Sequence, residues 1–125
     1  MAITVSCTDP DALLRKIRAA IREEKVKTWL LDKDGDFTHS PDQWKWKAWL
    51  TPQATETELI FYILGQKSKK MSSVVYAVYH GRLIEMLLTH FDADIKNATA
   101  SAFPIGNDRL GGSGVTPPST VSRAS

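Results

Sequence analysis

The chain has 125 residues, of which 42% are hydrophobic and 24% are charged, and its formal net charge is +2. This length gives room for one hydrophobic core, so we expect a single globular domain. The small charge does not by itself indicate a nucleic-acid-binding protein, and no apolar run approaches the ~20 residues that span a bilayer.

Cys7 is the only cysteine, so the sequence excludes an internal disulfide. No charged and then apolar leader opens the sequence, and we therefore expect a cytoplasmic protein. A lone thiol just before a helix can have a lowered pKa, but we favour a small buried residue for Cys7.

The first elements are a strand and a helix. Residues 3–7 alternate between apolar and polar and predict a short strand. Asp9 and Pro10 then supply a helix cap and a favoured early proline. The apolar residues at helical spacing are Leu13, Leu14, Ile17, Ala20 and Ile21. We expect this helix to cover one face of a sheet.

Residues 28–31 predict a second strand, which runs into Asp32-Lys33-Asp34-Gly35-Asp36. Asp-Gly is a strong signal for a tight hairpin turn. Carboxylates at alternating positions also suit a calcium loop, but the loop's sixth and twelfth positions, which should be glycine and glutamate, are Phe37 and Gln43. We therefore expect a solvated turn and assign no metal.

Two further strands are predicted after this turn. Residues 43–50 alternate, which predicts one face with Trp44, Trp46, Ala48 and Leu50 and another with Lys45, Lys47 and Trp49. Residues 52–57 read as a polar connection. Residues 58–64 are apolar on both faces, as in a central strand.

A second helix is predicted from Ser72 or Ser73 to about Phe91, after a basic loop. Its predicted apolar stripe is Val74, Ala77, Val78, Gly81, Ile84, Leu88 and Phe91. Glycine inside a helix destabilises it by ~1 kcal/mol relative to alanine. We favour close packing of the helix on the sheet as the explanation for Gly81. The alternative is a groove beside Tyr76, Tyr79 and His80. Residues 94–103 predict a weak edge strand.

The order β-α-β-β-β-α-β predicts an α+β fold, namely a ferredoxin-like two-layer sandwich. We expect an antiparallel or mixed sheet with two helices on one face. The domain would comprise residues 1–108, and residues 109–125, rich in Gly, Pro, Ser and Thr, predict a disordered tail.

Helices on one side would leave the other face of the sheet open. We expect Trp49, Lys45 and Lys47 on that face, with Tyr62 from the neighbouring strand. Exposed aromatic patches are typical of protein interfaces. Our first hypothesis is a non-catalytic binding or regulatory domain, without a cofactor, that self-associates or docks a protein partner through this face.

Two alternatives stay open. The same tryptophans and lysines, joined by Lys67, Lys69 and Lys70, suit single-stranded RNA or DNA, and three aspartates with magnesium would suit a nuclease. A small-molecule enzyme would instead use a pocket between the hairpin and the long helix, with His39, His80, Arg82 and Glu85 as its acid, base and anion-binding groups. Arg82 and Glu85 are three residues apart, so a surface ion pair also explains them.

Overall fold

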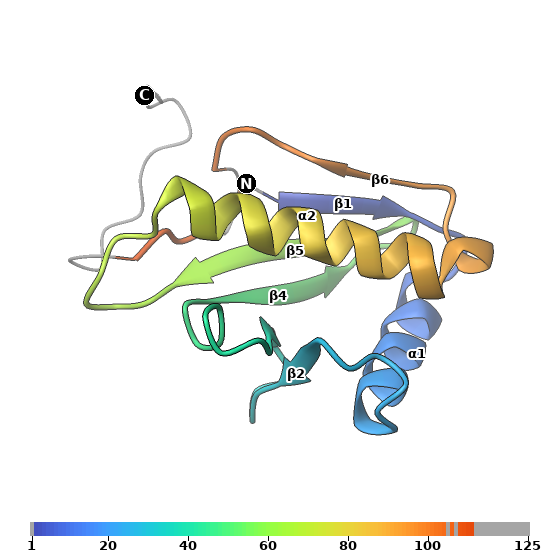
Figure 1. Cartoon of the computed structure of the whole chain (residues 1–125). Coiled ribbons are helices and arrows are strands. Elements are labelled where there is room, and N and C mark those ends of the chain that lie inside the picture. Colours follow the sequence, from blue (N-terminus) through green and yellow to red (C-terminus); the bar gives the residue numbers. More distant parts are fainter. Residues whose placement is uncertain (1, 105, 107, 112–125) are drawn as a thin grey trace.

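The computed structural model describes residues 2–104, 106 and 108–111 (Figure 1). Within these ranges the chain forms six strands, two α-helices and one 3-10 helix. In chain order they are β1 Ala2–Ser6, α1 Pro10–Arg22, β2 Trp29–Leu31, β3 Phe37–His39, β4 Ala48–Ala54, β5 Glu58–Gly65, α2 Ser73–His90, η1 Asp92–Asp94 and β6 Asn97–Ala100.

The strands form one sheet in the order β2-β3-β4-β5-β1-β6, and every neighbouring pair is antiparallel. The α+β class is therefore confirmed, with a six-stranded antiparallel sheet and two helices compatible with a two-layer sandwich. Four strands rather than the expected three separate the helices. The fourth is β3, which the sequence analysis missed.

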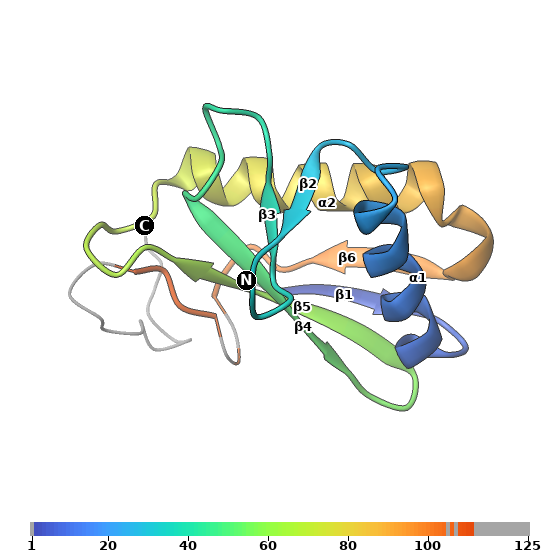
Figure 2. The same cartoon turned by 90° about the horizontal axis from the view of Figure 1, so that it is seen from below.

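One face of the sheet holds the core. The register places Ile3 beside Phe61 and Val5 beside Leu59, and all four side chains are fully buried. Side chains of both helices join them in one hydrophobic cluster: Leu13, Ile17, Ile21, Tyr79, Leu83, Met86 and Leu87. Figures 1 and 2 show α2 running across the sheet and α1 near the end where β1 finishes.

Both helix starts follow the sequence prediction. Asp9 caps α1 by accepting a hydrogen bond from the Ala12 N–H at 3.1 Å, and Pro10 is the first helical residue. Ser72 caps α2 in the same way through the Val75 N–H, also at 3.1 Å. These caps satisfy backbone donors that a helix leaves without partners.

The Asp-Gly turn is also confirmed, because the Asp32 carboxylate accepts the N–H groups of Asp34 and Asp36, each at 2.9 Å. However, the strand that returns is β3, and the strand predicted at 43–50 is wrong in its first half. Residues 41–47 form turns, in which the Lys45 N–H donates to the Pro41 carbonyl. Strand β4 begins at Ala48 and continues to Ala54, into the predicted connection.

The buried face of α2 also differs from the predicted stripe. The buried residues are Tyr79, His80, Leu83, Met86 and Leu87. Val74 and Leu88, which the stripe placed in the core, are 58% and 53% exposed. The helix is apolar on most sides, so spacing alone does not select the buried face, and the larger aromatic and Leu/Met side is buried instead.

The chain returns to the sheet after β6. Residues 108–111, which we call the closing segment, lie along the edge of β5 beyond the start of β1. Arg109 forms a parallel bridge with Leu64, and its N–H donates to the Ile63 carbonyl at 2.8 Å. The buried Asp108 accepts the Ile63 N–H at 2.9 Å. The boundary expected at Asp108 falls inside this segment, and the rest of the predicted tail, residues 112–125, lies outside the described residues.

Candidate functional site

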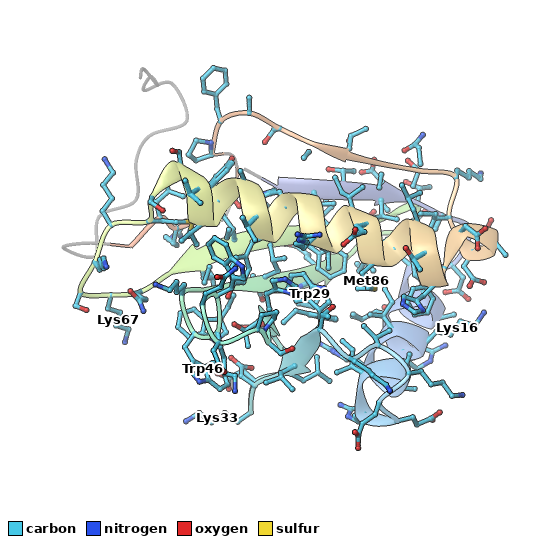
Figure 3. The ribbon with its side chains drawn as sticks, in the orientation of Figure 1. Lys16, Trp29, Lys33, Trp46, Lys67 and Met86 are labelled. Atoms are coloured by element: carbon cyan, nitrogen blue, oxygen red, sulfur yellow. The ribbon has the colours of Figure 1, made fainter. Side chains whose placement is uncertain are left out.

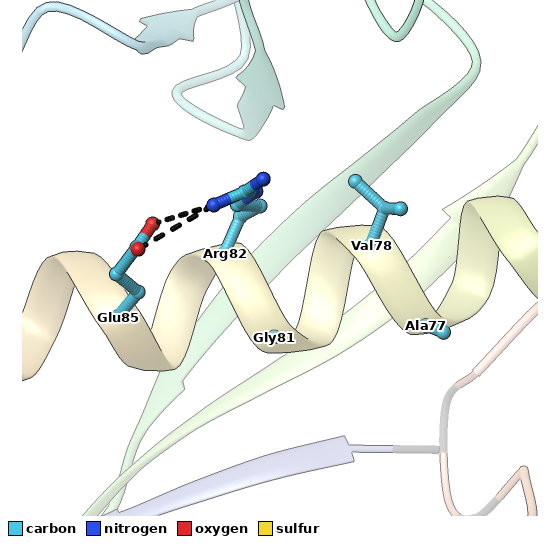
Figure 4. A pocket seen from close by; sticks show the side chains of 5 residues that line it. All are labelled: Ala77, Val78, Gly81, Arg82 and Glu85. Atoms are coloured by element: carbon cyan, nitrogen blue, oxygen red, sulfur yellow. Dashed lines mark hydrogen bonds and ion pairs between the residues drawn. The ribbon is translucent and has the colours of Figure 1, made fainter.

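The side of α2 that points away from the sheet carries an apolar surface. We call it the outer face of α2, and its residues are Val74, Ala77, Val78, Gly81, Arg82, Glu85 and Leu88. Spacings of three and four residues place them along one side of the helix. Five of them line a shallow depression: Ala77, Val78, Gly81, Arg82 and Glu85, which Figure 4 shows on α2.

Its exposure is unusual for a helix of this composition. Val74 and Leu88 are two of the four large hydrophobic residues that are exposed in the described part of the chain. A helix that is hydrophobic all round is normally buried on all sides. The charged residues within this face are Arg82 and Glu85, whose side chains pair at 3.1 Å, which confirms the expected surface ion pair. The outer face of α2 is therefore a candidate binding surface.

Gly81 lies at the middle of the outer face. A Cβ atom built there would meet no atom within 4 Å. Packing on the sheet, which we favoured as the reason for this glycine, is therefore wrong. Glycine destabilises a helix by ~1 kcal/mol relative to alanine, and packing within the domain does not explain why glycine occurs at this position.

Beneath α2 lies a buried aromatic cluster formed by Trp29, His39 and Tyr79. The ring centroids of Trp29 are 4.8 Å from His39 and 5.8 Å from Tyr79. The Tyr79 hydroxyl lies 3.0 Å from the Thr38 hydroxyl and also donates to the Trp44 carbonyl. The cluster therefore ties α2 to β2, to β3 and to the turns before β4.

His39 is buried in this cluster. Its Nδ1 lies 2.7 Å from the Thr28 carbonyl oxygen, to which it can donate. Burial is the main effect on the His39 pKa and lowers it; the Thr28 bond raises it, Arg82 lowers it and Glu85 raises it. The net direction is down, because desolvation penalises the charged imidazolium.

This lowered pKa predicts a loss of stability in mild acid. As pH falls below about 6.5, the unfolded chain takes up the His39 proton before the folded chain does, so the free energy of unfolding decreases. Urea unfolding at pH 7.5 and pH 5.0 measures this change. His39→Gln is expected to show a smaller difference between the two pH values, whereas an equal difference would contradict the role of His39.

The residues expected to form an enzyme pocket differ in their exposure. His80 is buried, stacks on Tyr76 with ring centroids 4.4 Å apart, and has its Nδ1 2.7 Å from the Tyr76 carbonyl oxygen. Arg82 and Glu85 are on the outer face, and the depression there is lined by neither His39 nor His80. His39 and His80 are thus buried, whereas Arg82 and Glu85 are exposed.

The uncovered sheet face differs from its expected composition. Trp49 and Tyr62 do lie on that face, and both are half-buried. Lys45 and Lys47 instead belong to the turns at 41–47. A Cβ atom at Gly106 would come within 2.7 Å of the Tyr62 ring, so the chain after β6 covers part of this face.

The most exposed tryptophan is Trp46, at 46%, and the sequence analysis had placed it inside. Its φ angle of +63° takes the chain out of the strand conformation. The alternating pattern of residues 44–47 does not reveal this conformation, so the sequence carried no clear signal of it.

Cys7 is buried, and burial raises the pKa of its thiol, so the lowered pKa considered for it is contradicted. Among residues 2–104, 106 and 108–111, no three His, Cys, Asp or Glu side chains gather as metal ligands would. Neither helix in those ranges is long and apolar enough to cross a membrane.

The outer face of α2 is thus the candidate that the geometry favours, and relatives offer no further guide to it. Comparison of the chain with protein-family models, curated proteins and solved structures gives no match.

Proposed function

We propose that this protein is a small, cytoplasmic, non-catalytic binding or regulatory domain, and that its partner on the outer face of α2 is a second copy of itself. The observation that carries the proposal is the exposed apolar surface around Gly81. We place the interface on α2 rather than on the open sheet face, because the chain after β6 covers part of the sheet face at Gly106.

The arrangement of the outer face suits a two-fold axis. If two α2 helices cross antiparallel at Gly81, residues equally far before and after it meet. Val74 would then face Leu88 of the second copy, seven positions from Gly81 in either direction. Such self-complementarity is what a two-fold interface requires, because each copy presents the same surface.

The sizes and charges of the residues agree with this arrangement. Gly81 at the crossing point allows close approach of the two backbones, and Ala77 one turn earlier is also small. The larger Val74 and Leu88 lie toward the ends, where helices diverge. The face carries one positive and one negative side chain, Arg82 and Glu85, so two copies do not repel one another.

The expected contact is small. The stretch from Val74 to Leu88 covers about 21 Å of helix, and one helix face of this length in each copy should bury less than the ~1,200–2,000 Å² that stable complexes bury. We therefore expect a dimer that dissociates on dilution, with the apolar contacts at Val74 and Leu88 as its main source of affinity.

Sedimentation velocity over a range of concentrations tests the proposal. The wild-type protein should shift toward twice its monomer mass as concentration rises. Gly81→Glu should weaken the dimer at least ~10-fold, because it places two charged side chains at the crossing point. Its monomer should stay folded, since glutamate is a better helix former than glycine.

Trp49→Ala is the matched variant for the competing sheet-face interface and should leave the dimer unchanged. If Trp49→Ala dissociates the dimer and Gly81→Glu does not, the sheet face is the interface. A monomer at every concentration would contradict self-association altogether.

We also propose that the fold is ferredoxin-like with an added hairpin. The order β6-β1-β5-β4, with α1 following β1 and α2 following β5, supports this. Strands β2 and β3 would then be an insertion between α1 and β4 that extends the sheet at one edge.

A further inference from the structure

A second surface, separate from the outer face of α2, lies where β4 starts and β5 ends. Ala48 pairs with Gly65, so the turns before β4 and the loop after β5 leave the sheet at the same end. The Gln66 side-chain amide joins them by donating to the Trp46 carbonyl at 2.9 Å. Figure 3 shows Trp46 and Lys67 toward this end of the molecule. We call this surface the Trp46 site; its residues are Lys45, Trp46, Lys47, Lys67, Lys69 and Lys70.

Trp46 is held there in a strained conformation. A φ angle of +63° is rare for a bulky residue, and its side chain is nevertheless 46% exposed. Both of its backbone groups are fixed: the N–H donates to the Thr38 hydroxyl at 3.3 Å, and the carbonyl accepts from Gln66. The surrounding hydrogen bonds thus hold the Trp46 backbone in a strained conformation, and its ring is partly exposed to solvent. Such strained residues are typical of binding sites.

Positive charge is concentrated around this ring. Residues 41–47 and 66–70 contain five lysines and one aspartate, whereas the whole chain has 16 basic and 14 acidic residues. Lys47, Lys67, Lys69 and Lys70 are exposed. Arg109, also exposed, is paired with Leu64 at the same end of β5. The local excess of charge therefore coincides with the exposed aromatic ring.

We propose that the Trp46 site binds single-stranded nucleic acid, with a base stacked on the Trp46 ring and neighbouring phosphates bound by the lysines. An exposed aromatic ring among cationic side chains is the combination that sequence-tolerant single-strand binding uses. An acidic peptide would satisfy the lysines but offers no flat face for the ring. The site is independent of the proposed dimer.

Fluorescence anisotropy of labelled 12-nucleotide RNA and DNA strands of mixed sequence tests this assignment. Trp46→Gly should weaken binding of either strand roughly 10-fold or more, because the stacking surface is lost. Glycine adopts a positive φ without strain, so the thermal midpoint of this variant should not fall. Trp46→Phe, which keeps a ring, should bind within about 3-fold of the wild type. A tighter RNA complex than DNA complex would identify RNA as the ligand, and the reverse would identify DNA.

Charge is tested separately by Lys67→Glu and its control Lys96→Glu, which makes the same change beside Ser6 at the opposite end of the sheet. Only Lys67→Glu should weaken binding. With four phosphates bound, affinity should fall about 50-fold between 50 and 200 mM salt. Equal binding by Trp46→Gly and wild type, equal binding of the matching duplex, or equally effective competition by polyglutamate would each overturn the proposal.

Discussion

Replacement of Tyr79 by alanine is expected to lower the free energy of unfolding by about 3–5 kcal/mol, which is a large part of the stability of a domain of this size. The Tyr79 side chain is fully buried and contacts both Trp29 and His39. Its removal leaves a cavity between α2 and the β2–β3 hairpin. Urea unfolding followed by circular dichroism measures the loss.

Tyr79→Phe separates the hydroxyl from the ring. This variant keeps the packing but leaves the Trp44 carbonyl without the donor that Tyr79 provides, and it removes the close contact with the Thr38 hydroxyl. We expect a loss of about 1–3 kcal/mol, clearly smaller than that of Tyr79→Ala. Equal stability of Tyr79→Phe and the wild type would contradict the role of the hydroxyl in holding the turns at 41–47.

The Tyr79 hydroxyl also connects the two proposed surfaces. On one side it belongs to α2, whose opposite side is the proposed dimer interface. On the other it meets Thr38, which accepts the Trp46 N–H and donates to the Ala48 carbonyl. Tyr79→Phe should therefore also weaken nucleic-acid binding, because the strained backbone of Trp46 loses part of its support.

Local signals in the sequence were sufficient for the helix starts and the first turn. Asp9 with Pro10, and Ser72, are short-range patterns whose hydrogen bonds involve residues only three positions away. The Asp32 turn is equally local. Such features do not depend on the rest of the fold, which explains why they could be predicted from the residues alone.

The orientation of α2 could not be predicted in the same way. Val74, Gly81 and Leu88 repeat at helical spacing, and so do Tyr79, Leu83 and Leu87 on another side. Both sets satisfy the same periodicity, so the choice depends on the partner surface, which is the cluster around Trp29 and His39. The side of α2 that was predicted to be buried is exposed and is the candidate interface. The helix has two apolar sides, and only one of them can pack on the sheet; this second apolar side was the signal that could have indicated an interface.

The site around Trp46 was missed for a related reason. The tryptophans and lysines alternate from Trp44 to Lys47, as in a half-buried strand. The hydrogen bonds that turn residues 41–47 out of the strand come from Pro41, Thr38 and Gln66, which are distant in the pattern or belong to other elements. Turn geometry, as well as the alternating pattern, decides how a strand pairs with its neighbours.

Replacement of Gly65 by alanine is expected to destabilise the protein by about 3 kcal/mol. A Cβ atom at Gly65 would lie 2.6 Å from the Leu110 carbonyl oxygen and 3.1 Å from the Gly111 nitrogen, both backbone atoms that no side-chain rotation can move. The closing segment would have to shift away from β5. That movement would weaken the bonds that Gly65 and Ile63 make with Arg109, in addition to the cost of overpacking.

Gly81→Ala is the matched control, because it makes the same chemical change where an added Cβ meets nothing within 4 Å. Measured at low concentration, where the monomer dominates, this variant should be up to ~1 kcal/mol more stable than the wild type, since alanine is the better helix former. Opposite signs for the two variants in urea unfolding would show that the closing segment is packed tightly against Gly65. A loss of less than about 0.5 kcal/mol for Gly65→Ala would instead mean that residues 108–111 yield easily and contribute little to the stability of the fold.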